Sequence, residues 1–494
     1  MKTELSTENL VERLKDKDYF IVDSNTKEEW VVFTVNGEKN TAKVNSSIYR
    51  NRIQHMYYSE YQRPLPKGVL EEIIAILAAY TKFEAEQKQL FLRVGEIGES
   101  FFYDLCNEFG DVVEISNVIK IKPTRKIIFK KFEEQKKQII SDKGKKLSGI
   151  CKYINIAPSE QLLFVVYIVS CFIPNIQHPI LLLHGESGNG KSTISTMIKE
   201  LVDPSKNALT KTSSSEADLY LSIERNWLTV FDNESKLSSK MSDNLCRVVT
   251  GIAISRRKLY TDNDAVSTNV KQCIILNGIE NIATKEDLLN RSLIFEVIRK
   301  KESEVVPFGD LMREFEHSKP EFLREIFNVL LKAKGIYTEL TDFKCTSRMA
   351  EFEKWGFAIG QVISGDGELF LKQYRANTLK QENEAIASNT LVSAIEIILN
   401  GSEKGFIELR PSDLLHKIQQ IAYKEGLSIQ SDTMPKDAVS VTKKLKAYKT
   451  LLQKIGIEFK HNGHTREGSQ ITLRKRKGLS QPSQDNAFDM GGGY

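Results

Sequence analysis

The sequence predicts an α/β fold built around a phosphate-binding loop, with an α/β region before that loop and helical and basic segments after it. An apolar run, Ile180–Leu183, leads directly into Gly-Glu-Ser-Gly-Asn-Gly-Lys-Ser-Thr at 185–193. Apolar residues then recur at helical spacing from Ile194 to Val202. Two further apolar runs each end in a polar residue, as expected where the carboxyl ends of parallel strands face a ligand.

The N-terminal region, residues 1–140, is predicted to form a mixed α/β domain. Strands are expected over Tyr19–Val22 and Trp30–Val35, and the spacing of apolar residues predicts a helix over Val69–Tyr80. The region shows no grouping of metal ligands or nucleophiles. Its basic run, Lys120–Lys131, is interpreted as a solvated face in preference to a DNA contact.

The glycine-rich segment has the pattern of a P-loop, and residues 141–305 are predicted to form the ATPase domain around it. Glycines let the backbone curl so that several N–H groups point at one anion at the positive end of a helix. Lys191 is expected to reach the β- and γ-phosphates of ATP, and the Ser192 hydroxyl is expected to ligate Mg²⁺. The residues expected to hold ATP are Gly185, Glu186, Ser187, Gly188, Asn189, Gly190, Lys191, Ser192 and Thr193.

Three polar residues follow at positions that suit phosphoryl transfer. Asp232 ends an apolar run and is predicted to hold Mg²⁺ together with Ser192. Asn277 ends the next run, where it could orient the attacking water or contact the γ-phosphate. Arg291 precedes a third run, and an arginine supplied across a subunit contact stabilises developing phosphoryl charge. Taken singly, these residues could be a turn residue, a strand cap and a surface charge, but their order favours the catalytic interpretation.

A basic segment ahead of the strand that ends at Asn277 is predicted to form a hairpin. Arg256, Arg257 and Lys258 are consecutive cations that precede Tyr260 and an Asp-Asn-Asp turn signal. Such cations contact DNA phosphates, and an aromatic ring can stack on bases. The alternative is a solvated basic strand edge, which the composition supports equally.

Residues 306–400 are rich in helical patterns with little strand signal, which predicts a helical lid over the nucleotide. An arginine in this segment could act as a second sensor of the phosphates, and Arg348 is one candidate. The sequence does not fix which arginine takes that role.

Residues 401–477 are predicted to form a winged helix-turn-helix domain that binds duplex DNA. A helix is expected over 438–455, with apolar residues on one face and Lys443, Lys446 and Lys454 on the other. Alternating apolar residues on both sides of an Asn-Gly turn predict the wing. A cationic helix face suits the major groove of DNA, and the alternative is a plain solvated helix.

Composition narrows the function classes. The net charge is +5, yet residues 401–480 hold 16 lysines and arginines against 8 acidic residues, which favours a polyanionic partner for that module. The six scattered cysteines include no C-x-x-C pair, which argues against a zinc site and favours a reducing cytoplasm. The apolar run Leu162–Ile173 is too short to span a membrane and is predicted to be a buried helix. The tail, 478–494, is predicted to be disordered.

Together the motifs resemble those of the replicative AAA+ helicases of bacterial mobile elements and phages, which are MCM-like and superfamily-3-like. The resemblance spans roughly residues 60–477, and its motifs are 185–193, Phe231–Asn233, Ser255–Asp262, Ile275–Ile279 and Asp287–Ser292. It implies a hexameric ring, ATP hydrolysis between subunits, and single-stranded DNA drawn through a central pore. It also implies that Arg291 is the arginine finger, that Asn277 is sensor 1, and that Arg256–Lys258 belong to a pore hairpin.

One position departs from that family's pattern. AAA+ ATPases commonly place a glutamate directly after the magnesium-holding aspartate, whereas this chain has Asn233 there and Glu234 one residue later. Because asparagine cannot accept a proton, Glu234 is the candidate for the catalytic base.

The sequence thus favours a cytoplasmic DNA helicase that uses ATP and Mg²⁺ in the replication of a mobile element or phage, with no membrane partner. An initiator or regulator that uses ATP as an assembly switch, without unwinding, stays open because of Asn233. A small-molecule P-loop kinase is disfavoured, because it leaves Arg291, the basic hairpin and the winged helix without a role.

Overall fold

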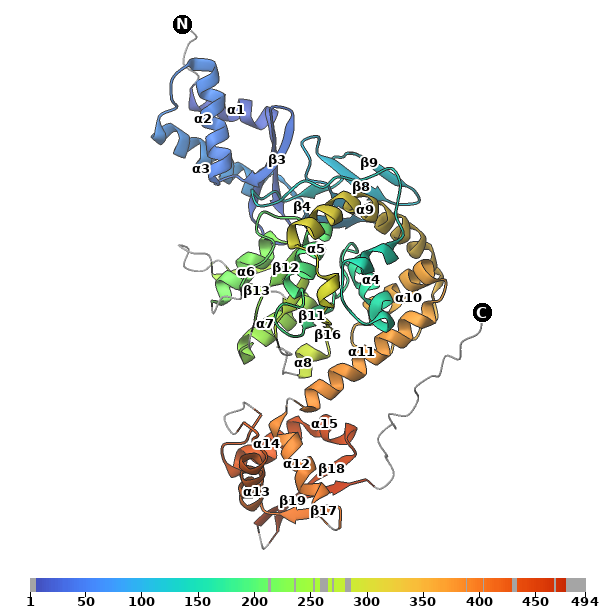
Figure 1. Cartoon of the computed structure of the whole chain (residues 1–494). Coiled ribbons are helices and arrows are strands. Elements are labelled where there is room, and N and C mark those ends of the chain that lie inside the picture. Colours follow the sequence, from blue (N-terminus) through green and yellow to red (C-terminus); the bar gives the residue numbers. More distant parts are fainter. Residues whose placement is uncertain are drawn as a thin grey trace, which may run out of the picture. The chain divides into compact units, whose positions relative to one another are not determined.

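The computed structural model of the chain divides into two compact units, Met1–Gln381 and Glu382–Tyr494 (Figure 1). The residues that it describes are 6–211, 215–234, 237–251, 254–257, 265–268, 271–279, 286–387, 389–402, 404–428, 433–465 and 468–476. The tail predicted to be disordered, 478–494, lies outside these residues. Within the described parts of the chain, no helix combines the length and apolar character needed to cross a membrane.

The first unit begins with a four-stranded sheet and three helices (Figure 1). Its elements are α1 (Thr7–Lys17), β1 (Tyr19–Asp23), β2 (Glu29–Val35), β3 (Glu38–Lys43), α2 (Ser47–Tyr61), α3 (Lys67–Glu84) and β4 (Glu86–Lys88). The strand order is β3-β2-β1-β4. One core contains Phe20 and Phe33 together with residues of the three helices, while Trp30 belongs to a second core with Ile128. The helix predicted over 69–80 lies inside α3.

A second sheet, which is antiparallel, follows. Contacts in this region correct the prediction for the basic run Lys120–Lys131. Its strands are β6 (Val94–Ile97), β7 (Ser100–Asp104), β8 (Asp111–Ile115) and β9 (Ile119–Pro123), while β5 (Leu90–Phe91) pairs with β10 (Ile128–Phe129). Lys130 forms an ion pair with Asp23 at 2.7 Å, and Lys131 forms one with Asp104 at 2.5 Å. The prediction of a solvated face over Lys120–Lys131 is therefore wrong at the end of the run, because two buried carboxylates draw these lysines inward.

The centre of the first unit is a parallel sheet of four strands. They are β11 (Ile180–His184), β12 (Leu228–Phe231), β15 (Cys273–Asn277) and β16 (Ser292–Glu296), in the order β12-β15-β11-β16. All three pairings are parallel. Nearly every residue in these strands is buried, as expected for a parallel sheet with both faces covered. The chain is thus a mixed α/β protein with a parallel sheet, in line with the coarse fold prediction.

Helices connect and surround this sheet (Figure 1). They are η1 (Leu147–Lys152), η2 (Pro158–Glu160), α4 (Gln161–Ser170), α5 (Lys191–Val202), α6 (Glu216–Arg225), α7 (Ser239–Thr250), α8 (Glu286–Leu289), η3 (Glu302–Glu304), α9 (Phe308–Glu339), α10 (Ala350–Ser364) and α11 (Gly367–Ala387). Helix α4 is buried from Leu163 to Ser170, as predicted for this apolar run. The helical patterns predicted within 306–400 include α12 (Thr390–Asn400), which lies in the second unit, beginning at Glu382.

The second unit combines four helices with a three-stranded antiparallel sheet. After α12 come β17 (Phe406–Leu409), α13 (Pro411–Lys424), α14 (Ala438–Ala447), α15 (Lys449–Lys454), β18 (Ile457–Thr465) and β19 (Gly468–Lys475), with the strand order β17-β19-β18. The prediction of a single helix over 438–455 is wrong, because Tyr448 leaves helical geometry at ψ 16°. This break lets Leu451 and Leu452 both reach the core, where they are 2% and 0% exposed.

Arg93 ties the N-terminal strands to the end of helix α5. Its buried guanidinium donates to Asp203 Oδ1 at 3.0 Å and to three backbone carbonyl groups. Asp203 also accepts hydrogen bonds from Lys199 Nζ at 2.8 Å and from the backbone N–H of Trp227 at 2.8 Å. Burial would raise the pKa of Asp203, but Lys199 and Arg93 hold it below its ordinary value.

A buried histidine should make stability depend on pH. Burial lowers the pKa of His178 to about 3, whereas an unfolded histidine titrates near 6.5. The unfolded chain therefore binds the extra proton first, so stability falls as the pH drops from about 6.5 towards 3, by up to about 1.4 kcal/mol per pH unit. We expect His178→Phe, which keeps an aromatic ring against Trp227, to reduce this slope. Urea denaturation between pH 7 and pH 4.5 measures it, and equal slopes for both proteins would contradict the prediction.

Candidate nucleotide site

A glycine-rich loop, residues 185–190, joins β11 to α5 at the carboxyl edge of the parallel sheet. Gly185 has φ +142°, and a Cβ there would lie 2.6 Å from the Val297 carbonyl oxygen. Gly190 caps helix α5 with φ +90°. Glycine suits both positions because side chains disfavour such backbone angles. The loop thus leads into the N-terminus of α5, where free N–H groups and the helix dipole favour an anion.

Lys191, the first residue of α5, folds back onto this loop. Its Nζ donates to the carbonyl oxygens of Gly185 and Glu186, both at 2.7 Å. The residue is only 9% exposed, and this burial lowers its pKa, although Asp232 acts in the opposite direction. A desolvated ammonium in this position would be stabilised by an anion brought close to it.

Polar side chains from three elements meet beside the loop. Ser192 Oγ donates to Asp232 Oδ1 at 2.7 Å, and Asn277 Nδ2 donates to the same oxygen at 2.6 Å. Asn277 Nδ2 also donates to Ser195 Oγ at 3.0 Å. Asp232 follows β12 and Asn277 ends β15, which are neighbouring strands. The structure therefore brings together three residues singled out in the sequence and adds Ser195, one turn along α5.

Asn277 also fixes the chain that follows Asp232. Its side-chain oxygen accepts from the backbone N–H of Asn233 at 2.7 Å, and its backbone oxygen accepts from the N–H of Glu234 at 2.9 Å. Because a backbone N–H can only donate, Oδ1 of Asn277 must face Asn233, and Nδ2 must face Asp232. Asn233 has φ +57°, a left-handed conformation that asparagine tolerates better than most residues.

Asn233, at the usual position of the catalytic base, and Glu234, the candidate base, both lie at this same edge of the sheet. Asn233 is exposed and Glu234 is half-buried. The left-handed backbone at Asn233 gives a conformational reason for asparagine at a position where the resembling family has glutamate. The assignment of Glu234 as the base stays a prediction.

We expect Asn277→Asp to destabilise the chain by about 2–4 kcal/mol at pH 7.5, because it places a second carboxylate against Asp232 and removes two donated hydrogen bonds. Two close carboxylates cannot both ionise cheaply, so the loss should shrink as the pH falls towards 5. Urea denaturation at both pH values tests this. Ser195→Ala is the control, with an expected loss of about 1 kcal/mol at either pH. A loss for Asn277→Asp that is the same at both pH values would contradict the explanation.

Arg291 lies at the opposite edge of the parallel sheet. It precedes β16, whose first residue, Ser292, pairs with Ile180 at the start of β11, whereas the glycine-rich loop follows the end of β11. A five-residue strand spans about 16 Å. The fold therefore separates Arg291 from the loop of its own chain.

Arg291 shares a carboxylate with Arg348, the other arginine considered in the sequence. Asp287 Oδ1 lies 3.1 Å from Arg291 Nη2 and 2.6 Å from Arg348 Nη1. Burial would raise the pKa of Asp287, but hydrogen bonds from Arg291, Cys246 and Arg348 bring it below its ordinary value. The sequence analysis included Asp287 in a motif but assigned it no role, although the i, i+4 spacing of an acid and an arginine was a usable signal.

Strands β13 (Ile254–Arg257) and β14 (Ala265–Thr268) pair antiparallel, as the predicted basic hairpin requires. Arg256 and Arg257 lie on β13, while Lys258 and the turn lie outside the described residues. Gly251 precedes the hairpin and Lys271 follows it. A Cβ on Gly251 would lie 2.8 Å from the Lys271 side chain, so both ends of the hairpin segment leave the domain at one point.

The basic residues singled out in the second unit lie on two helices. Lys443 and Lys446 are exposed on α14, and Lys454 is exposed on α15.

In the described parts of the chain, no three histidine, cysteine, aspartate or glutamate side chains gather as a metal site would require.

Comparison with solved structures gives weak likenesses. Two apo structures in the A form, of the NrS-1 C-terminal region and of its residues 305–718, are 12% identical and each has a TM-score of 0.41. They cover 94% and 96% of this chain and 98% and 100% of theirs. A further apo structure of that region is 12% identical at a TM-score of 0.40, covering 96% of this chain and 99% of that one. Curated proteins give no match.

Two family models match, and both describe one kind of protein. The model for the actinomycete integrative conjugative element replication protein matches residues 145–383. The model for the AICE RepA C-terminal domain matches residues 389–484. Together they take in the glycine-rich loop, the parallel sheet and nearly all of the second unit. Residues 145–383 and 389–484 are therefore similar to the replication proteins of actinomycete integrative conjugative elements.

Proposed function

We propose that the chain is an ATP-dependent DNA helicase that unwinds DNA during replication of a mobile element, with an AAA+ type P-loop ATPase core. The observation that carries the nucleotide site is the contact of Ser192 and Asn277 with one oxygen of Asp232, beside the N-terminus of α5. The similarity of residues 145–383 to a family of replication proteins supplies the biological setting.

The residues present fit a magnesium–ATP complex. Mg²⁺ takes oxygen ligands and usually keeps several waters, so one hydroxyl and one carboxylate suffice on the protein side. Ser192 Oγ and Asp232 Oδ1 offer these oxygens 2.7 Å apart. When bound, Mg²⁺ would neutralise charge between the β- and γ-phosphates.

The chain's own groups would then bind and orient the triphosphate. The N–H groups of the loop and of the first turn of α5 face an anion, and the Lys191 ammonium would exchange its two carbonyl partners for phosphate oxygens. Asn277 holds Asp232 in place and sets the backbone of Asn233 and Glu234. Glu234 is our candidate to accept the proton of the attacking water.

The position of Arg291 supports hydrolysis between subunits. Because it lies at the far edge of the sheet from its own loop, it can meet a γ-phosphate only at the loop of another copy. This arrangement requires a homo-oligomer, and we propose a closed ring, with a hexamer as the expected size. Arg348, bound to the same Asp287, would enter that contact beside Arg291.

DNA contacts are proposed for the β13–β14 hairpin and for the second unit. The second unit has the element order helix, strand, three helices, then a two-stranded hairpin; with α14 and α15 taken as one interrupted helix, this is the order of a winged helix-turn-helix domain. Its exposed Lys443 and Lys446 on α14 would contact the phosphates of duplex DNA. The hairpin, with Arg256 and Arg257 on β13, would contact the single strand.

A second candidate function is an initiator that uses ATP as an assembly switch without unwinding. The specific observation in its favour is Asn233, whose exposed amide cannot accept a proton. If Glu234 does not act as a base, hydrolysis would be slow and ATP would act mainly through binding.

A forked-duplex assay separates these functions. Strand release and DNA-stimulated ATPase are measured for wild type, Lys191→Ala, Asn233→Ala and Glu234→Ala. The helicase proposal expects strand release by wild type and none by Lys191→Ala. ATPase without strand release by wild type would favour the initiator. Full turnover by Glu234→Ala would refute the base assignment alone.

A further inference from the structure

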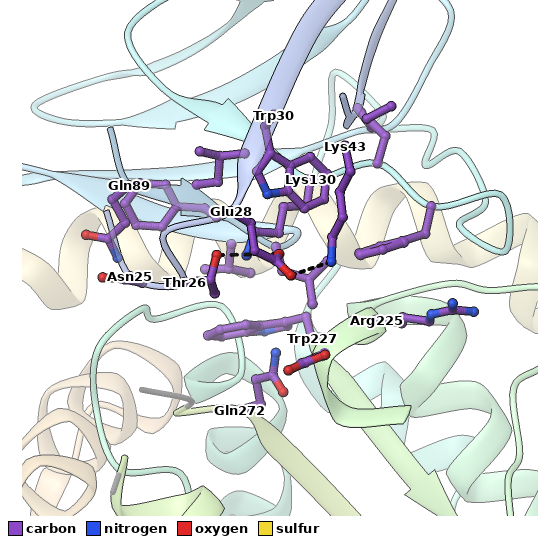
Figure 2. Close-up of a pocket in the computed structure, with 18 of the residues that line it drawn as sticks. Asn25, Thr26, Glu28, Trp30, Lys43, Gln89, Lys130, Arg225, Trp227 and Gln272 are labelled. Atoms are coloured by element: carbon purple, nitrogen blue, oxygen red, sulfur yellow. Dashed lines mark hydrogen bonds and ion pairs between the residues drawn. The ribbon is translucent and has the colours of Figure 1, made fainter. Parts of the chain in front are cut away.

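A cavity of about 590 Å³ lies on the side of the parallel sheet away from the glycine-rich loop (Figure 2). Its lining includes Trp227 and Gln272, which directly precede β12 and β15, and Trp30 from the N-terminal sheet. Figure 2 shows Trp30 on one side of the cavity and Trp227 and Gln272 on the other. These positions mark the amino edge of the sheet, so the cavity is separate from the candidate ATP site.

Two residues of the cavity lining each carry a buried polar atom that has no hydrogen-bond partner among the described residues. Trp30 is 2% exposed and Gln272 is 8% exposed. Neither Trp30 Nε1 nor Gln272 Oε1 has a hydrogen-bond partner among the described residues. An unsatisfied buried donor or acceptor costs about 1–3 kcal/mol. Both atoms have less than 1 Å² of accessible surface, so a ligand in the cavity would meet the Trp30 ring and the rest of the Gln272 amide group.

Of the four lysines in the lining, three are paired with carboxylates; Glu224 and Arg225 also line the cavity, and Arg225 pairs with Glu134. Lys43 is neutralised by Glu28 at 2.5 Å, and the pair lies between the two walls (Figure 2). Lys130 and Lys131 are likewise neutralised by carboxylates behind them. By contrast, Lys271 donates to the Asn175 carbonyl oxygen at 2.7 Å and forms no ion pair within the described residues. Its positive charge is therefore left at the rim.

We propose that this cavity binds a nucleobase, with the attached phosphate at Lys271. A nucleobase is uncharged, presents donors and acceptors along one edge, and suits the aromatic walls that Trp30, Phe91, Phe132 and Trp227 provide. Lys271 and Gly251 are also the two points where the β13–β14 hairpin segment leaves the domain. A single DNA strand bound to that hairpin would lie near Lys271, and a free nucleotide is the other source of the same chemistry.

Photocrosslinking on the full chain tests the site. Lys191→Ala serves as the background, so that the glycine-rich loop contributes little binding. The probes are oligothymidylate carrying 5-iododeoxyuridine and, separately, free 5-iododeoxyuridine monophosphate. Irradiation followed by peptide mass spectrometry locates adducts on aromatic side chains. The choice of a nucleobase rests on the proposed DNA binding, but this readout needs neither hydrolysis nor unwinding, so the two can fail separately.

Adducts are expected on peptides that carry Trp30, Phe91, Phe132 or Trp227. Gln272→Met, which removes the whole side-chain amide, should lower their yield about fivefold, as loss of a hydrogen bond worth about 1 kcal/mol predicts. Lys271→Met should also lower the adduct yield relative to the background protein, and this loss should be larger at low salt than at high salt. Trp355→Phe is the control, because Trp355 stacks on Tyr337 away from the cavity.

Each outcome decides the proposal. Adducts from the oligonucleotide identify single-stranded DNA as the ligand, and adducts from the mononucleotide alone identify a free nucleotide. Absence of adducts on all four aromatic residues with both probes would overturn the proposal. Equal yields in Gln272→Met, Lys271→Met and the background would also overturn it. Circular dichroism and thermal melting confirm that the variants are folded.

Discussion

Arg291→Ala is expected to lower the ATPase kcat by about 10³-fold or more, with ATP binding unchanged, because a trans arginine acts on charge that develops only in the transition state. The residue is 20% exposed in its side chain and lies at the sheet edge opposite its own loop. ATPase rates and equilibrium nucleotide binding measure the two effects. Arg313→Ala, at an exposed arginine paired with Asp310 on its own helix, is the control and should leave the rate unchanged.

Mixing subunits makes this prediction specific. Lys191→Ala lacks the loop lysine but keeps Arg291, and Arg291→Ala has the reverse defect. If the arginine acts between copies, a contact that joins the intact loop of one variant to the intact arginine of the other is competent. Equal mixing would make about one quarter of the contacts competent, so measurable ATPase should return. If mixtures stay as inactive as the separate variants while forming mixed oligomers, Arg291 does not act in trans.

Arg93→Ala is expected to destabilise the first unit by about 3–5 kcal/mol, the usual cost of breaking a buried ion pair by removing one partner. The change leaves Asp203 with one cation fewer and three buried carbonyl groups without their donor. Urea denaturation followed by circular dichroism measures the loss. Arg313→Ala is again a suitable control, because a surface pair contributes about 0–1 kcal/mol.

The pH dependence gives a second readout for Arg93. Because the folded-state pKa of Asp203 is lowered, its contribution to stability is present above the unfolded value near 3.9 and is lost as the pH falls through the folded pKa. At pH 7 the full cost of losing Arg93 should therefore appear. A loss below about 1 kcal/mol at that pH would show that the surroundings can replace the guanidinium.

The candidate site was predictable because most of its parts are local in sequence. A strand, a glycine-rich loop and a helix are adjacent in the chain, so hydrophobic spacing and glycine placement suffice to locate them. Asp232 and Asn277 followed from one topological rule, since parallel strands end at the same edge. The role of Asp287 was missed because it depends on Arg348, which lies far along the chain. Only the folded chain shows that one carboxylate serves two arginines.

The errors arose where tertiary packing overrides a local pattern. The spacing of Val441, Leu445 and Leu452 suits one helix, yet the break at Tyr448 buries Leu451 as well. Lys130 belongs to a run that looks solvated, but its partner Asp23 comes from the first strand of the chain. Arg93 gave no local signal at all, because its acceptor Asp203 is 110 residues away. Pairings at such separations are set by the whole fold.

Helix α5 works as a short rigid rod with both ends fastened. Its first residue, Lys191, donates a hydrogen bond to the glycine-rich loop. Asp203, directly after its last turn, accepts a hydrogen bond from Arg93 of the N-terminal strands. Twelve helical residues span about 18 Å and bend little. The N-terminal strands and the glycine-rich loop are thus joined through one helix, so a movement of either is expected to be transmitted to the other.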